Sequence, residues 1–77
     1  MSEYEYLFES PELLRDRPLD AARILEAVSK SKLKPLAVRV DNDRGQVIFY
    51  FEKPLEKDEK SELDLIVKKI FQEKKKA

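Results

Sequence analysis

The sequence predicts a small α+β domain with the element order β-α-β-β-α. Three observations predict it: two segments that alternate apolar and polar residues, an apolar segment of strand length after a turn cluster, and two stretches with helical apolar spacing. The chain has 77 residues, which is the size of one domain. We expect residues 1–77 to form a single domain, in which residues 72–77 are a basic tail that frays.

The first predicted strand covers residues 3–9. A period of two along this segment is that of a strand with one buried face. One side of the predicted strand carries Tyr4, Tyr6 and Phe8, and the other side carries Glu3, Glu5, Leu7 and Glu9. Pro11 ends the strand because proline has no amide hydrogen to donate to a ladder. Residues 10–18 then form a polar connection with a short turn at residues 11–14.

The first predicted helix begins at Pro18, whose fixed φ suits a first helical turn, or is capped by Asp20. Its apolar stripe at i, i+3, i+4 and i+7 is Ala21, Ile24, Leu25 and Val28. Pro35 cannot continue a helix. Lysines near the end of this helix complement its dipole.

A β-hairpin is predicted next. Residues 36–41 alternate, with Leu36, Val38 and Val40 on one side, and lead into a turn cluster that holds the only glycine, Gly45. We expect Gly45 to supply a positive φ. Residues 47–51 form the next strand and are apolar on both faces. The two strands are joined as a β-hairpin by a loop of about four or five residues.

The second predicted helix covers residues 56–74. Its apolar stripe is Leu63, Ile66, Val67, Ile70 and Phe71. Asp58 and Glu59 lie in its first turn and lysines lie toward its end, and both biases suit the helix dipole. The apolar strand 47–51 belongs in the middle of the sheet. We therefore expect a three-stranded antiparallel sheet of order 1-3-2, with both helices on one face.

Composition excludes several kinds of chemistry. The chain has no His and no Cys, so it lacks the commonest general base, thiolate ligands and disulfides. One glycine builds no phosphate-binding loop. Carboxylates on helix first turns are capping charges, and Asp41 and Asp43 fit turn chemistry better than a cation site. We expect no enzyme activity, cofactor, metal or small-molecule substrate.

Charge and hydropathy bear on partners and location. The 16 basic and 16 acidic residues give zero net charge, which argues against nucleic acid. No apolar run approaches the ~20 residues of a membrane span. The acidic N-terminus is not that of a signal peptide, so we expect a protein that stays where it is made. Lys and Glu enrichment fits a heat-adapted source, and a Lys/Glu-rich mesophile fits as well.

One candidate site is a protein-binding surface. If both helices cover the Phe49 and Phe51 side, Ile48 and Tyr50 face outward together with Ala37. An outward apolar patch and two unpaired edge strands favour self-association or docking on a larger assembly. The residues we assign to partner binding are Leu7, Arg39, Ile48 and Tyr50. Alternatively, Ile48 and Tyr50 are only half-exposed strand formers.

A second candidate is nucleic-acid binding by the lysines at the end of the chain, with Arg39. Lysines beside aromatic side chains can bind single strands through stacking and phosphate contacts. The simpler interpretation is that the aromatic residues form the core and the lysines solvate a helix terminus. The lysines concerned are Lys68, Lys69, Lys74, Lys75 and Lys76.

The sequence also resembles a family. The segment Val47-Ile48-Phe49-Tyr50-Phe51-Glu52-Lys53-Pro54-Leu55, with the later Glu59-Lys60, Leu63-Asp64 and Ile66-Val67, resembles the C-terminal half of small uncharacterised bacteriophage proteins. Asp16-Arg17-Pro18-Leu19-Asp20 is similar to the start of their first helix. Two features depart from the family: Glu56 or Lys57 replaces the usual Thr or Ser cap, and no His follows the Ile-Val pair.

The resemblance implies a virion-associated or prophage-encoded structural part among tail and tail-fibre components, with no catalytic residue carried over. We therefore expect a non-enzymatic structural or adaptor protein, located in the virion or the host cytoplasm. Its partner is then a copy of itself or a larger viral assembly. The alternative function is a small regulatory protein that binds nucleic acid or a host protein.

Overall fold

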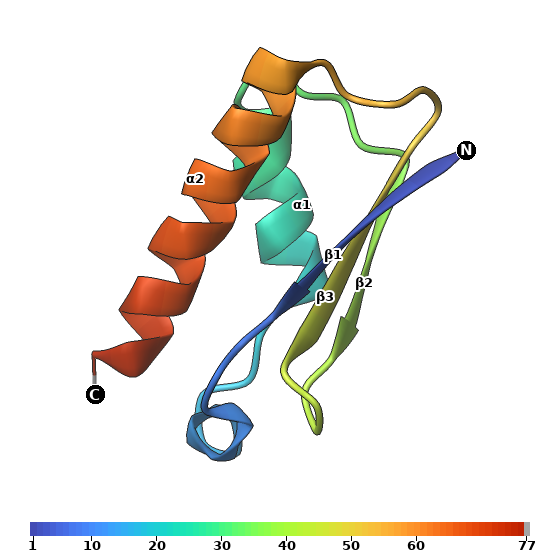
Figure 1. The fold of residues 1–77 in the computed structure, drawn as a ribbon. Helices are drawn as coiled ribbons and strands as arrows, with labels where there is room; N and C mark the ends of the chain where they lie inside the picture. Colours follow the sequence, from blue (N-terminus) through green and yellow to red (C-terminus); the bar gives the residue numbers. More distant parts are fainter. Residues whose placement is uncertain (77) are drawn as a thin grey trace.

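The structure is a computed structural model that describes residues 1–76. The chain folds into a three-stranded sheet, and its helices lie against one face of that sheet (Figure 1). The elements are β1 (Ser2–Leu7), the short 3-10 helix η1 (Pro11–Leu14), α1 (Ala21–Ser29), β2 (Ala37–Asp41), β3 (Gln46–Phe51) and α2 (Lys57–Lys75). Ala77, the last residue of the predicted basic tail, lies outside the described residues.

The sheet has the order β1-β3-β2, and both neighbouring pairs are antiparallel. The predicted α+β class and the strand order 1-3-2 are therefore confirmed. β3 is central because it pairs with β1 on one side and β2 on the other. Its residues alternate between half-buried and buried positions, with Val47, Phe49 and Phe51 buried. β1 and β2 are the two edges of the sheet.

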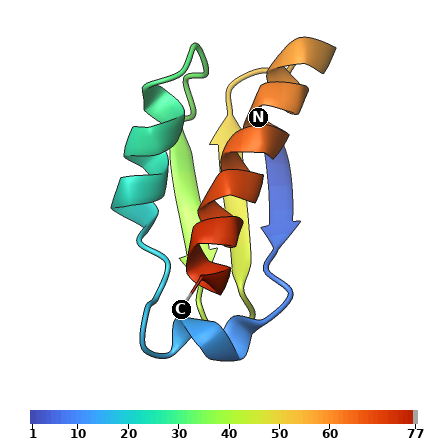
Figure 2. The same cartoon turned by 90° about the vertical axis from the view of Figure 1, so that its left-hand side faces the viewer.

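Both helices pack on the face that carries these three buried residues (Figures 1 and 2). α1 is capped by Asp20, whose carboxylate accepts a hydrogen bond from the Ala22 amide. α2 begins at a capping box in which Glu56 is the N-cap and the Glu59 carboxylate accepts from the Glu56 amide. Glu56, and not Lys57, is therefore the residue at the N-cap of α2.

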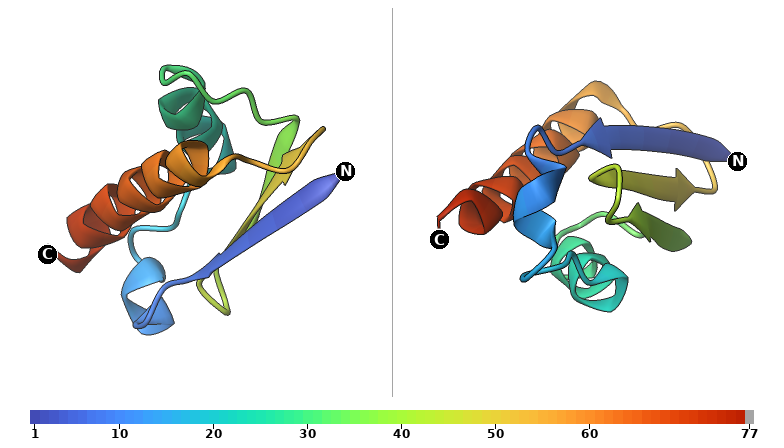
Figure 3. Two further views of the ribbon diagram at one scale, coloured as in Figure 1. Left: turned by 45° about the horizontal axis from the view of Figure 1, so that its top comes forward. Right: turned by 90° about the horizontal axis from the view of Figure 1, so that it is seen from below.

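The core lies between the sheet and the two helices. Edge-to-face aromatic pairs join β1 to β3, Tyr4 with Phe51 and Tyr6 with Phe49. Phe8, the residue that follows β1, makes a similar pair with Phe71 of α2. η1 contributes the buried residue Leu14, and the connecting segments contribute Phe8, Leu19 and Leu33. Figure 3 shows η1 between the ends of β1 and α2, where it closes one end of the core.

Several boundaries differ from the sequence predictions. β1 ends at Leu7 rather than at residue 9, although Phe8 stays buried and its amide donates to the Gly45 carbonyl at 2.7 Å. β2 begins at Ala37, and Leu36, expected on the core side, is 57% exposed. α2 starts and ends one residue later than predicted, and the fraying of residues 72–77 stays a prediction.

No helix in residues 1–76 has both the length and the apolar content that a membrane crossing requires. This finding agrees with the sequence, in which no sufficiently long apolar run occurs.

Candidate interaction surface

The face of the sheet opposite the helices is the candidate site, and we call it the open face. Figure 3 shows that no described segment lies over it. The register builds it from three rows of side chains that run across the strands in the order β1, β3, β2. The rows are Glu3, Tyr50 and Ala37; then Glu5, Ile48 and Arg39; then Leu7, Gln46 and Asp41.

The structure brings the four predicted contact residues onto this one face. Ile48 and Tyr50 are neighbours along β3 and are half-buried, while Arg39 is exposed directly across from Ile48. Leu7 lies in the next row on the β1 edge and is 62% exposed. Ile48 and Tyr50 therefore do not lie beneath the helices.

Glu5 is a member of the middle row that the candidate residues did not include. The register pairs Glu5 with Ile48 from the β1 side, and Arg39 flanks Ile48 from the β2 side. Ile48 thus stands between an acidic and a basic side chain. Alternation placed Glu5 and Leu7 on one side of their strand, but only the cross-strand register shows which residues they flank.

The helix side of β1 carries a polar cluster that has a structural role. The Tyr6 hydroxyl donates to Asp64 Oδ1 at 2.6 Å, and Lys60 Nζ lies 2.5 Å from the same oxygen and 3.2 Å from the hydroxyl. The Lys60 hydrogen bond and then the Tyr6 hydrogen bond lower the pKa of Asp64. Burial, followed by the Asp64 hydrogen bond, raises the pKa of Tyr6. The cluster fastens α2 to β1.

This cluster predicts a loss of stability in acid. Because the pKa of Asp64 is lowered on folding, its contribution is present above the ordinary pKa of 3.8 and disappears as the pH falls through the lower folded value. Replacing Asp64 by asparagine should flatten the decline in urea midpoint below about pH 4. Asp43→Asn, which changes an exposed turn side chain, should follow the wild type. Identical acid profiles for both variants would contradict the role of Asp64.

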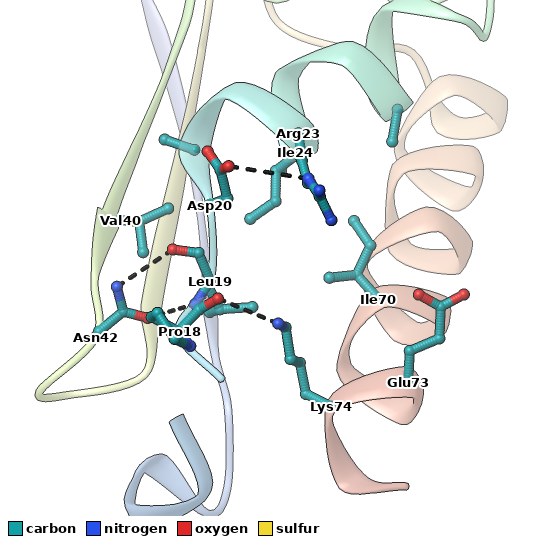
Figure 4. A pocket seen from close by; sticks show the side chains of 12 residues that line it. Pro18, Leu19, Asp20, Arg23, Ile24, Val40, Asn42, Ile70, Glu73 and Lys74 are labelled. Carbon is teal, nitrogen blue, oxygen red and sulfur yellow. Dashed lines mark hydrogen bonds and ion pairs between the residues drawn. The ribbon is translucent and has the colours of Figure 1, made fainter. Parts of the chain in front are cut away.

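A groove of about 770 Å³ lies between α1 and α2 (Figure 4). Ile24 and Ile70 line it from the two helices, and Val40 lines it from β2. Its charged rim is engaged within the chain: Lys74 Nζ donates to the Pro18 carbonyl at 3.1 Å, and Arg23 lies 4.0 Å from Asp20. The groove thus offers fewer free polar groups to a ligand than its residue types suggest.

The turn before β3 is held by its own side chains. Asp41 Oδ1 accepts from the amides of Asp43 and Arg44. The Asn42 side chain makes two hydrogen bonds to the backbone of Leu19: Oδ1 accepts from the Leu19 amide at 2.7 Å, and Nδ2 donates to the Leu19 carbonyl at 3.2 Å. The sequence pattern predicts only a turn at Asn42. Within residues 1–76 no group of three acidic, His or Cys side chains could hold a metal ion.

The basic end of α2 is partly engaged as well. Lys75 Nζ pairs with Glu9 at 3.2 Å, and Lys74 Nζ donates to the carbonyl of Pro18 in the loop that precedes α1. The aromatic side chains Tyr4, Tyr6, Phe49 and Phe51 pack on the helix side of the sheet. Among the sheet aromatics, Tyr50 alone is on the open face, which lies on the other side of the sheet from α2 (Figure 1).

Comparison with known proteins adds no relative. No protein-family model matches the chain, and neither the curated proteins nor the solved structures include a match.

Proposed function

We propose that this chain is a non-enzymatic structural or adaptor protein of phage type that acts through protein–protein contacts made by the open face. Its copies associate through this face and take part in a larger viral assembly. The resemblance to small bacteriophage proteins supports the viral setting, and the composition of the open face supports the mode of action.

One observation carries the proposal: the central strand presents Ile48 and Tyr50 on the face that the helices leave uncovered. The solvent face of an antiparallel sheet normally carries polar side chains. Burying apolar surface contributes roughly 25 cal/mol per Å², so covering Ile48, Tyr50 and Leu7 would favour association. The two edge strands offer further contacts at the borders of the same face.

The alternative function, binding of nucleic acid through Arg39 and the lysines of α2, has weaker support. Those lysines and the one open-face aromatic residue, Tyr50, lie on opposite sides of the sheet. A single strand would therefore not meet both at once. Salt titration separates the alternatives, because a phosphate-driven complex weakens steeply with salt and an apolar contact changes little.

Replacing Tyr50 by aspartate is expected to abolish association. The change places a charge in the centre of the buried contact, where desolvation is costly. Sedimentation equilibrium from micromolar to millimolar protein should show self-association of the wild type and a monomer for Tyr50→Asp. Circular dichroism should be native for both, since Tyr50 is outside the core.

Leu65→Asp is the matched control. Leu65 is 66% exposed on α2, so the same kind of change is made away from the open face. This variant should associate like the wild type. A wild type that is monomeric at every concentration contradicts the proposal, as does equal association of all three proteins.

A further inference from the structure

We propose that the open face binds a second copy of this chain, face to face, about a two-fold axis that runs parallel to the strands. In this arrangement Glu5 of each copy lies opposite the partner's Arg39, and Ile48 and Tyr50 meet their own counterparts. This inference rests on the proposed function and specifies its partner and geometry.

The middle row carries the argument. It runs Glu5, Ile48, Arg39 across the sheet, so it is acidic at one edge, apolar at the centre and basic at the other edge. A two-fold axis parallel to the strands reverses the strand order of the partner across the interface. Each row of one copy then lies opposite the same row of the other copy. β1 then faces the partner's β2, so the acidic Glu5 end of the middle row lies opposite the partner's basic Arg39 end, and the reverse holds at the other end. An isologous contact of this kind closes as a dimer.

The other face-to-face axis is unfavourable. A two-fold axis perpendicular to the strands, within the interface plane, would set Glu5 against the partner's Glu5 and Arg39 against the partner's Arg39. Like charges brought together at an interface disfavour that arrangement. With the axis parallel to the strands, the outer rows set Glu3 against the partner's Ala37 and Asp41 against the partner's Leu7, so no like charges meet.

The dimensions allow the contact and predict its strength. Packed sheets lie about 10 Å apart with strands within about 30° of each other, a spacing that long Glu and Arg side chains can cross. Three strands of six residues or fewer span roughly 15 by 20 Å. That area is well below the ~800 Å² per partner of a standard interface, so the dimer is expected to be weak and seen at high protein concentration.

A charge exchange tests the axis. In Glu5→Arg, both ends of the middle row are basic, and in Arg39→Glu both ends are acidic, so each variant should repel its own copy. We expect each single variant to raise the dimer dissociation constant about tenfold or more in sedimentation equilibrium. An equimolar mixture should form a heterodimer, because each acidic end then meets a basic end. The double variant Glu5→Arg/Arg39→Glu should dimerise like the wild type.

The outcomes separate the axis from the proposed function. If the wild type is monomeric throughout, the proposed function fails and this inference fails with it. If Tyr50→Asp disrupts a wild-type dimer but the single charge variants still dimerise alone and gain nothing by mixing, only the axis is wrong. Single variants that dimerise as tightly as the wild type, together with a mixture of Glu5→Arg and Arg39→Glu that binds more tightly than the wild type, would indicate the perpendicular axis, because that axis sets position 5 against position 5 and position 39 against position 39. Circular dichroism of every variant checks that the fold is kept.

Discussion

Replacing Phe49 by alanine should remove a large part of the stability of this domain. Phe49 is 0% exposed at the centre of β3, and its ring packs edge-to-face on Tyr6 with centroids 5.8 Å apart. Truncating a buried Phe costs about 3–5 kcal/mol. A domain of this length has a total stability on the order of 4–12 kcal/mol. The melting temperature followed by circular dichroism should fall by roughly 15–30 °C.

Ile48→Ala is the control for this prediction. Ile48 neighbours Phe49 on the same strand, but its side chain lies on the open face. Its truncation should cost about 1 kcal/mol, mainly from strand propensity. If the two variants lose similar stability in the monomeric state, measured at low protein concentration, the assignment of the two sheet faces is wrong.

Replacing Gly45 by alanine should also destabilise the fold strongly. Gly45 has φ of +67°, and a Cβ there would lie 3.0 Å from both the Cβ and the carbonyl oxygen of Phe8. The left-handed conformation and the close contact together should cost about 2–4 kcal/mol. The displaced turn would also strain the hydrogen bond from the Phe8 amide to the Gly45 carbonyl. A reduced urea midpoint with an unchanged slope is the expected result.

Arg44→Ala tests whether the effect belongs to Gly45 itself. Arg44 is the preceding turn residue, and its exposed side chain lies 3.9 Å from Asp41. An exposed pair of this kind contributes about 0–1 kcal/mol, so the midpoint should change little. Equal losses in Arg44→Ala and Gly45→Ala would show that the turn tolerates neither change and that the Phe8 contact is not the cause.

Local patterns were sufficient for the elements and their order. The alternation in β1, the helical stripe in α2 and the single glycine each depend on short-range geometry, which a sequence displays directly. The apolar character of residues 47–51 placed them in the centre of the sheet. Because these residues are apolar on both faces, the outward position of Ile48 and Tyr50 was only a conditional prediction, and the structure decides it by burying Val47, Phe49 and Phe51.

Contacts made by irregular segments were not predictable in this way. Leu14, Leu19 and Leu33 are buried although no periodic pattern surrounds them. The two hydrogen bonds between the Asn42 side chain and the Leu19 backbone join residues that are 23 positions apart. Leu36 continues the alternation of its strand and is nevertheless exposed, because β2 begins one residue later.

The amino-acid sequence by itself determined the α+β class and the strand order, because periodicity and turn chemistry act over a few residues. Only the tertiary structure decided which side chains of different strands are cross-strand neighbours. That register places Glu5 and Arg39 on either side of Ile48, and it depends on turn length and core packing, which act between residues far apart in the chain.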